Sequence, residues 1–220
     1  MNLKSTLLIL IVAAAAIVAG SWFSSSQETE KEKAIQAARE KFSSIQGNVL
    51  SPARKITVPY LQKHDGTAFT GEELQGHWSI LFFGFTHCSE ICPVTMAKLA
   101  QAKKLAEEQG LDFPEVYLVS IDQERDDLQS LGKFVGGFDE SFTGVTGDPK
   151  LIKALSLQMS VVYMPAEQPK DVENYQIDHS AALLLLNPQG SLKAFLNPPH
   201  TAEKILKEIV AVTSVEEIPE

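Results

Sequence analysis

Residues 79–93 read SILFFGFTHCSEICP, and they contain the strongest structural signal in the chain. Its first seven residues form a nearly continuous apolar run, which is typical of a central strand buried on both faces. Cys88 and Cys92 follow this run closely, and Pro93 is tolerated in the first turn of a helix. The two cysteines are therefore expected in the junction between a buried strand and a helix.

Strands and helices alternate on both sides of this junction. The pattern predicts strands at 56–58, 79–85, 116–121, 142–145, 181–186 and 192–196, a turn at 63–66, a β-like piece at 161–164, and helices at 97–109, 126–134, 149–157 and 201–212. This order indicates an α/β domain whose mixed sheet is covered on both faces. Functional groups of such sheets gather in loops at the carboxyl ends of the strands.

Length and charge narrow the class of protein further. The length of 220 residues predicts one core-forming domain, and the formal net charge of the chain is −9. The acidic balance argues against a nucleic-acid partner, because phosphate contacts need clustered lysines and arginines.

The amino-terminal region is unlike the rest of the chain. Residues 5–27 carry no charged side chain and are long enough, as a helix, to cross a bilayer. We predict a single-pass membrane anchor over residues 1–26, with Lys4 on the cytoplasmic side and Trp22 at the interface. A signal peptide cleaved before Ser21 is the alternative. Either segment would export the remainder, and the absence of an Arg-rich presequence favours a bacterial inner membrane with the domain facing the periplasm.

The exported part divides into three segments. Residues 27–52 are rich in Glu, Lys and other helix-forming residues, and we expect a polar helical stalk or linker there. Residues 53–213 are predicted to form the folded domain. Residues 214–220 are expected to be a frayed tail.

Two cysteines are too few for a disulfide-stapled scaffold. A bridge between Cys88 and Cys92 would close a very small loop and add little stability. Helix N–H groups near the pair favour thiolates, and a soft pair of thiolates suits Cu(I). A structural zinc site would need four protein ligands, so any metal site needs a donor from elsewhere.

Five histidines are available as that donor. We expect His64 and His200 to be ordinary surface residues and His77 to lie in a loop, while the side chain of His87 should point away from that of Cys88. His179 lies in the polar trio before the buried strand at 181–186, at one end of the sheet. Its spacing alone also fits a histidine that merely caps a strand.

These motifs together resemble the Sco/SenC family of copper-binding proteins of cytochrome oxidase assembly. The resemblance covers residues 56–212 and rests on the phrases Gly84-Phe85-Thr86-His87-Cys88, Cys92-Pro93, Ser120-Ile121-Asp122, Glu124-Arg125-Asp126, Thr146-Gly147 and Asp178-His179-Ser180. The chain departs from the family pattern at Ser89-Glu90, where Pro-Asp is usual, at Gln123, where Pro is usual, and at Asp127, where Thr is usual. None of these changes removes a ligand.

The resemblance implies a thioredoxin-like fold and a site for Cu(I) and Cu(II) formed by Cys88, Cys92 and His179. It also implies a Cys88–Cys92 disulfide in the oxidised protein. Asp122 would orient the site or contact a partner. We interpret Met96, one turn beyond Cys92, as a core or rim residue rather than a ligand.

Three functions remain open at this point. The first is a copper chaperone, rather than an enzyme, that takes copper from a donor protein and helps assemble the copper site of cytochrome c oxidase subunit II. The second is a membrane-anchored thiol–disulfide oxidoreductase that keeps the cysteines of a copper site reduced. The third is a redox or copper sensor. Peroxide reduction is disfavoured, because no arginine signature surrounds Cys88.

Overall fold

The structure, a computed structural model, describes residues 48–165 and 175–216. The predicted anchor at 1–26 and most of the predicted stalk at 27–52 lie outside these ranges, as do the last four residues of the predicted tail. No helix within the described ranges combines the length and the hydropathy that a membrane crossing requires.

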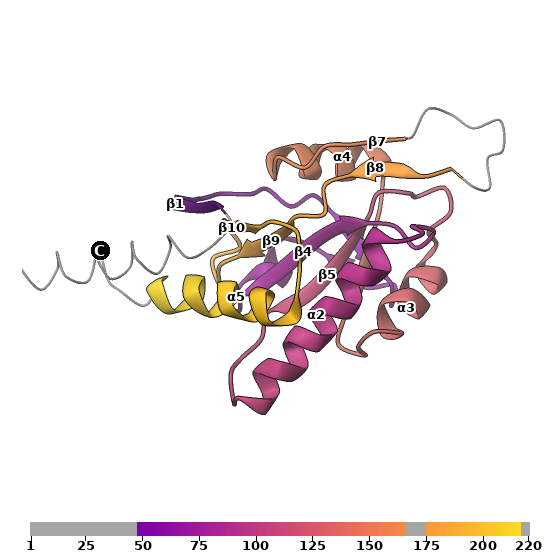
Figure 1. Cartoon of the computed structure of the whole chain (residues 1–220). Helices are drawn as coiled ribbons and strands as arrows, with labels where there is room; N and C mark the ends of the chain where they lie inside the picture. The colour runs from indigo at the N-terminus through magenta and orange to yellow at the C-terminus, as the bar shows by residue number, and fades with distance from the viewer. Residues whose placement is uncertain (1–47, 166–174, 217–220) are drawn as a thin grey trace, which may run out of the picture. The chain divides into compact units, whose positions relative to one another are not determined.

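A mixed sheet of eight strands organises the described residues (Figure 1). The strand order is β1-β10-β9-β4-β5-β6-β2-β3. Strands β4, β5 and β6 are parallel, whereas β9 pairs antiparallel with β4, and β10 with β9. The bounds are β1 Asn48–Arg54, β2 Leu61–Lys63, β3 Ala68–Phe69, β4 Ser79–Gly84, β5 Glu115–Ser120, β6 Thr143–Thr146, β9 Leu183–Leu186 and β10 Leu192–Leu196.

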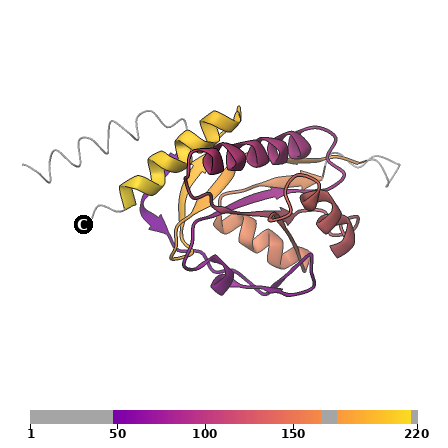
Figure 2. The ribbon, with the colours of Figure 1, turned by 90° about the horizontal axis from the view of Figure 1, so that it is seen from below.

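Helices cover both faces of the sheet. Helices α2 (Ile91–Glu108) and α5 (Ala202–Glu216) lie side by side on one face, as Figure 2 shows, and α3 (Leu128–Gly136) packs beside β6. Helix α4 (Pro149–Gln158) lies across the sheet from α2 and α5 (Figure 1). The remaining elements are a short 3₁₀ helix η1 (Gly71–Leu74) and a two-stranded ribbon of β7 (Tyr163–Pro165) and β8 (Ile177–His179).

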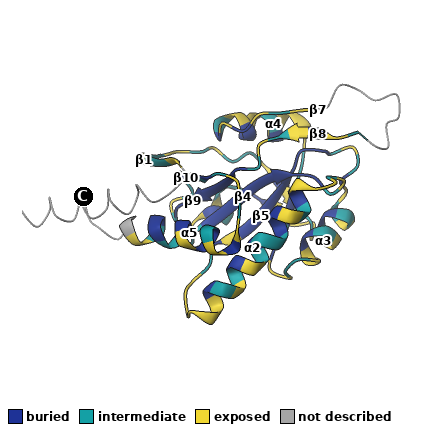
Figure 3. Ribbon diagram, viewed as in Figure 1, coloured by how far each residue is buried: buried dark blue, intermediate teal, exposed yellow. Residues whose placement is uncertain are grey.

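The core lies around β4, as the apolar run predicted. All six residues of β4 are buried, and Phe82, Phe83 and Phe85 are among the largest fully buried side chains. Figure 3 shows β4, β5 and β9 as the buried centre of the sheet. The order β10-β9-β4-β5, with α2 and α5 on one face, is the thioredoxin-like arrangement that the resemblance implied.

Two of the predicted strands need correction. Residues 56–58 form no strand. The strand β1 lies earlier, at Asn48–Arg54, and most of it falls in the segment expected to be stalk. Proline is unusual inside a sheet, but β1, which contains Pro52, is an edge strand that pairs with β10, and an edge tolerates proline. The predicted strand at 181–186 begins at Leu183, and residues 177–179 form the separate strand β8.

Two helix bounds also differ from the prediction. Helix α2 begins at Ile91 rather than at residue 97, so Cys92 and Pro93 lie inside its first turn. Those residues need no N–H bond to a preceding turn, which explains how the helix accommodates Pro93. Helix α5 continues to Glu216, and the N–H of Lys204 is capped by Oγ1 of Thr201 at 3.2 Å, as expected.

Candidate metal centre

The cysteine loop connects the carboxyl end of β4 to α2. The backbone N–H of Cys92 donates a hydrogen bond to Sγ of Cys88 at 3.3 Å, so the first sulfur lies over the amino terminus of the helix. Cys88 is partly exposed and Cys92 is buried. The junction between β4 and α2 therefore holds one accessible sulfur and one buried sulfur.

His179, the last residue of β8, meets this pair. Its Nε2 lies 3.4 Å from Sγ of Cys92, and its Nδ1 lies 3.0 Å from the carbonyl oxygen of Ser180. A carbonyl oxygen only accepts, so Nδ1 carries the proton and Nε2 presents its lone pair. The ring centroid lies 5.9 Å from the rings of both Phe82 and Phe85, which restrict its orientation.

The three predicted ligands thus come together. One sulfur from each cysteine and one imidazole nitrogen of His179 all lie within 4.8 Å of one another. Two sulfurs and one imidazole nitrogen are soft to borderline donors, and they suit a thiophilic transition metal better than a hard cation. The donor set fits a three-coordinate ion, and within the described residues it offers no fourth thiol or imidazole for a closed tetrahedral site.

The two thiols differ strongly in acidity. A hydrogen bond from the Cys92 thiol and the N–H groups of Cys92 and Glu90 lower the pKa of Cys88 to about 4. The same thiol–thiolate hydrogen bond, together with burial, raises the pKa of Cys92 far above its usual range. At neutral pH the pair therefore holds one proton, with the negative charge on the accessible sulfur.

Asp126 fixes the start of the cysteine loop. Its buried carboxylate accepts hydrogen bonds from the N–H of Thr86 at 3.1 Å, from Oγ1 of Thr86 at 2.5 Å and from Oγ of Ser120 at 2.8 Å. These contacts join the loop after β4 to the carboxyl end of β5. Sequence reasoning quoted Asp126 as part of a motif without giving it this role.

Asp122 lies outside the ligand set. It belongs to a second group, with His87 and Asp126, whose atoms also lie within 4.8 Å of one another. Both of its oxygens are already engaged, since Oδ2 accepts from Nε of Arg125 at 2.5 Å and Oδ1 accepts from the hydroxyl of Tyr175 at 2.5 Å. Burial and this hydrogen bond raise the pKa of Tyr175 to about 12, so the phenol is the donor.

The remaining candidates are not part of the group of ligand atoms. Met96 is fully buried, so it is a core residue as interpreted. His64 and His200 are not the surface residues that we expected. Nδ1 of His64 accepts from the N–H of Gly144 at 3.0 Å, which joins a turn to β6. Nε2 of His200 donates to the carbonyl of Ala181 at 2.8 Å, which joins the segment before α5 to the segment before β9.

The chain matches known proteins over most of the described domain. The family model described as SCO1/SenC matches residues 50–214. The chain is 32% identical over 185 residues to Protein SCO1 homolog 1, mitochondrial, of Arabidopsis thaliana, and 34% identical over 147 residues to Protein SCO2 homolog, mitochondrial, of Homo sapiens. These alignments cover 83% and 66% of this chain, but only 54% and 55% of the relatives.

A solved structure shows the same fold. The copper-bound crystal structure of Arabidopsis thaliana ScoI has a TM-score of 0.66 and 33% sequence identity, and the match covers 74% of this chain and all of that one. The family match spans most of the chain and includes both cysteines and His179. The chain belongs to the SCO1/SenC family.

Proposed function

We propose that this chain binds one copper ion through Cys88, Cys92 and His179 and passes it to the copper site of cytochrome c oxidase subunit II. The observation that carries the proposal is the convergence of two sulfurs and one imidazole nitrogen within 4.8 Å. Cu(I) accepts low coordination and thiolate ligands, so it suits this set. Copper in a solved relative of the same fold supports the assignment.

Transfer would proceed by ligand exchange, with copper as the cargo. The thiolate of Cys88 is partly exposed, so an incoming thiolate or imidazole of the acceptor can approach the ion beside it. Cys92 is buried and would release the ion last. Each exchange replaces one donor by another, so the ion is never released to water.

A second function is supported by the asymmetry of the thiols. An accessible thiolate beside a buried thiol is the arrangement that thiol–disulfide exchange uses, with Cys88 attacking and Cys92 resolving the mixed disulfide. Such a reaction would leave Cys88 and Cys92 joined as a disulfide and the substrate reduced. It would keep the acceptor's cysteines able to bind copper, so the two functions are compatible.

We also propose that the domain works at the periplasmic side of a bacterial inner membrane. The uncharged stretch at 5–27, with Lys4 before it, supports this placement. A fusion of the full chain to a reporter that is active only outside the cytoplasm would test it. An inactive reporter on a stable fusion would contradict the proposal.

Copper titration of the purified full chain tests the main proposal. The reduced protein is titrated with Cu(I) against a competing chelator, and we expect one tightly bound ion per chain. Cys88→Ser, Cys92→Ser and His179→Ala should each weaken binding at least tenfold, whereas the neighbouring His87→Ala should not. Unchanged copper affinity in His179→Ala, with rapid thiol–disulfide exchange, would replace the chaperone by the oxidoreductase.

Delivery needs a test in cells. A strain that lacks this protein should lose cytochrome oxidase activity when copper is scarce and recover it when copper is added. The wild-type chain should restore activity under scarcity, and the Cys88→Ser chain should not. Full oxidase activity of the deletion strain under scarcity would count against delivery.

A further inference from the structure

Tyr175 links β8, the strand that ends in His179, to the loop that follows β5. It lies four residues before His179, at the entry to β8. Its hydroxyl donates to Oδ1 of Asp122 at 2.5 Å, and its ring lies 3.6 Å from Cζ of Arg125. Arg125 completes the group by donating from Nε to Oδ2 of Asp122 at 2.5 Å.

The Asp122–Arg125 pair that Tyr175 contacts is largely shielded from water, which strengthens its interactions. The side chain of Asp122 is 1% exposed and that of Arg125 is 13% exposed, so both charges have lost most of their water. A hydrogen bond to a buried, charged carboxylate is stronger than one at the surface, and a guanidinium over an aromatic face adds a cation–π attraction. Arg125 also lies 5.7 Å from the ring of Phe85, which itself contacts His179.

The location of β8 explains why such a contact is needed. Strand β8 pairs with β7 in a ribbon that is not part of the eight-stranded sheet. Residues Tyr163 and His179 face each other in that ribbon. Ladder hydrogen bonds to the main sheet therefore do not fix the position of His179, although they fix that of the cysteine loop through β4.

A neighbouring side chain makes a second, weaker link. The amide of Gln176 accepts from the N–H of Ser89 and donates to the carbonyl of His87, each at 3.4 Å. The two residues before β8 thus contact two loops of the main sheet, one holding the cysteines and the other Asp122. Both loops follow adjacent parallel strands, β4 and β5.

We propose that Tyr175 is a positioning residue for His179, and that its hydrogen bond to Asp122 and its stacking on Arg125 hold β8 where Nε2 of His179 faces Cys92. Asp122 and Arg125 form the anchor on the main sheet. The inference rests on the proposed function, because it concerns how the histidine is held for copper. It gives Asp122 a role that requires no contact with the metal.

The size of the loss in Cu(I) affinity can be estimated from metal sites in which a residue that orients a ligand has been replaced. Removing a residue that orients a ligand typically weakens metal binding by about ten- to a hundredfold. Tyr175→Ala removes both the hydrogen bond and the stacking, and we expect at least about a tenfold loss of Cu(I) affinity. Tyr175→Phe keeps the ring on Arg125 and should give a smaller, several-fold loss of Cu(I) affinity, because only the hydrogen bond is removed.

A double-mutant cycle separates positioning from general stabilisation. The full chain is prepared with Tyr175→Ala and Tyr175→Phe, each alone and combined with His179→Ala, and Cu(I) affinity is measured by chelator competition. If Tyr175 acts through His179, its replacement weakens copper binding in the wild-type background and changes it less than twofold when His179 is absent. Equal losses in both backgrounds would overturn the inference.

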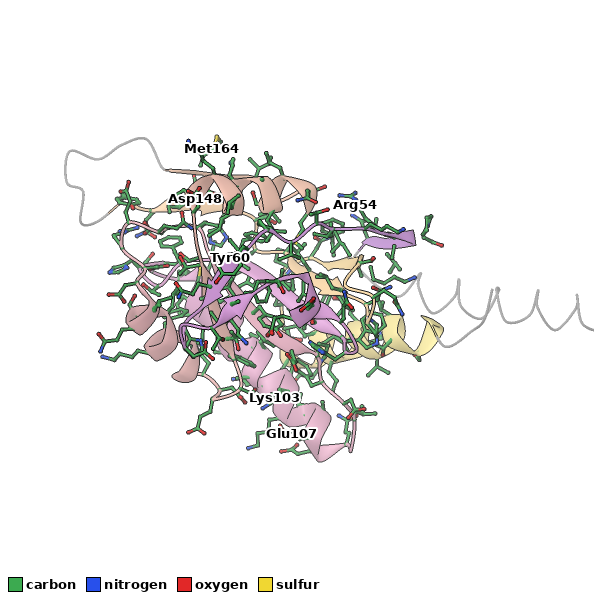
Figure 4. All side chains as sticks on the ribbon, turned by 180° about the vertical axis from the view of Figure 1, so that it is seen from behind. Arg54, Tyr60, Lys103, Glu107, Asp148 and Met164 are labelled. Carbon is green, nitrogen blue, oxygen red and sulfur yellow. The ribbon has the colours of Figure 1, made fainter. Side chains whose placement is uncertain are left out.

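Matched controls and a spectrum complete the test. Tyr60, which is labelled in Figure 4, is 71% exposed and lies more than 100 residues before β8 in sequence. The control variant Tyr60→Ala should bind copper as wild type does. Tyr175→Phe, which retains packing, should also shift the visible absorption and electron paramagnetic resonance spectra of bound Cu(II). A Tyr175→Phe protein with wild-type affinity and spectra would contradict positioning, even if Tyr175→Ala failed to fold.

The outcomes distinguish this inference from the proposed function. If the wild-type chain binds no copper, or binds it without dependence on Cys88, Cys92 and His179, both proposals are wrong. If wild-type binding depends on the three ligands but Tyr175→Ala and Tyr175→Phe bind copper as wild type does, only the positioning role of Tyr175 is wrong.

Discussion

Sγ of Cys92 lies 3.4 Å from Nε2 of His179, although 87 residues separate the two in sequence. The cysteine comes from the first turn of α2 and the histidine from the end of β8. The candidate copper site depends on this contact. Substitutions that displace either side chain should therefore change the copper affinity, and those in the packed core should also change the free energy of unfolding.

Gly84 leaves the space that Cys92 occupies. A Cβ at this position would lie 2.9 Å from Sγ of Cys92 and 3.0 Å from Cδ1 of Leu118, both too close. Gly84→Ala should therefore destabilise the fold by about 1–3 kcal/mol and weaken Cu(I) binding, as thermal unfolding and chelator competition will measure. Gly136→Ala is the control, because a Cβ there meets nothing within 4 Å and alanine favours the helix. If Gly84→Ala were as stable as Gly136→Ala, the core would accommodate the added Cβ without cost, and the prediction would be wrong.

The acidity of Cys88 predicts an unusual pH dependence of its reactivity. With a pKa of about 4, the folded protein holds Cys88 as thiolate throughout the range from about pH 5.5 to 8. The rate of alkylation by iodoacetamide in the reduced, metal-free protein should therefore change little across this range. An ordinary thiol, with a pKa near 8.5, would react about tenfold faster for each pH unit gained.

Cys92→Ala is the matched variant for that experiment. The Cys92 thiol donates a hydrogen bond that lowers the pKa of Cys88, and the variant removes it. The pKa of Cys88 should therefore rise, and the alkylation rate should again increase with pH. Mass spectrometry of the wild-type protein should place the label on Cys88, since Cys92 is fully buried. A flat profile in Cys92→Ala would assign the low pKa of Cys88 to another cause.

Asp126 should be important for stability although it is not expected to bind the metal. Asp126→Ala would leave the N–H and Oγ1 of Thr86 and the hydroxyl of Ser120 without their acceptor. Loss of hydrogen bonds to a buried carboxylate should lower the free energy of unfolding by about 2–4 kcal/mol, measured by urea denaturation. Asp112→Ala, at an exposed position, should change it by less than about 0.5 kcal/mol. Equal stabilities of the two variants would refute the role of Asp126 as an anchor for the cysteine loop.

Met96 should be replaceable without loss of copper. It is fully buried on α2, one turn after Cys92, and leucine has nearly its volume. Met96→Leu should bind Cu(I) with wild-type affinity and change stability by less than about 1.5 kcal/mol. A tenfold weaker affinity in a folded Met96→Leu protein would make the thioether a ligand.

The predictable parts of the fold were those with strong local patterns. The apolar run at 79–85 predicted β4, and the alternation that follows it predicted β5, α3, β6, α4 and β10 to within two residues. The pattern failed at β1, where Pro52 hides an edge strand, and at β8, where three residues are too few to show alternation. Such elements form because partner strands are present, and no local pattern encodes them.

The kinds of ligands could be read from residue types without the structure. Two cysteines four residues apart after a buried strand, and one histidine before another, established two sulfurs and an imidazole as the candidate donors. Residue type decides which metals a site suits, and residue type is read directly from the chain. The family motifs then selected His179 from five histidines.

The exposure and acidity of those donors, in contrast, depend on the folded structure. It set Cys88 apart from Cys92 in exposure and acidity, because hydrogen bonding and burial shift a pKa and both depend on the packed environment. It also placed Asp122 between Arg125 and Tyr175 instead of beside the sulfurs. Contacts across 53 residues of chain, such as that between Asp122 and Tyr175, arise only when the sheet and the ribbon are packed together.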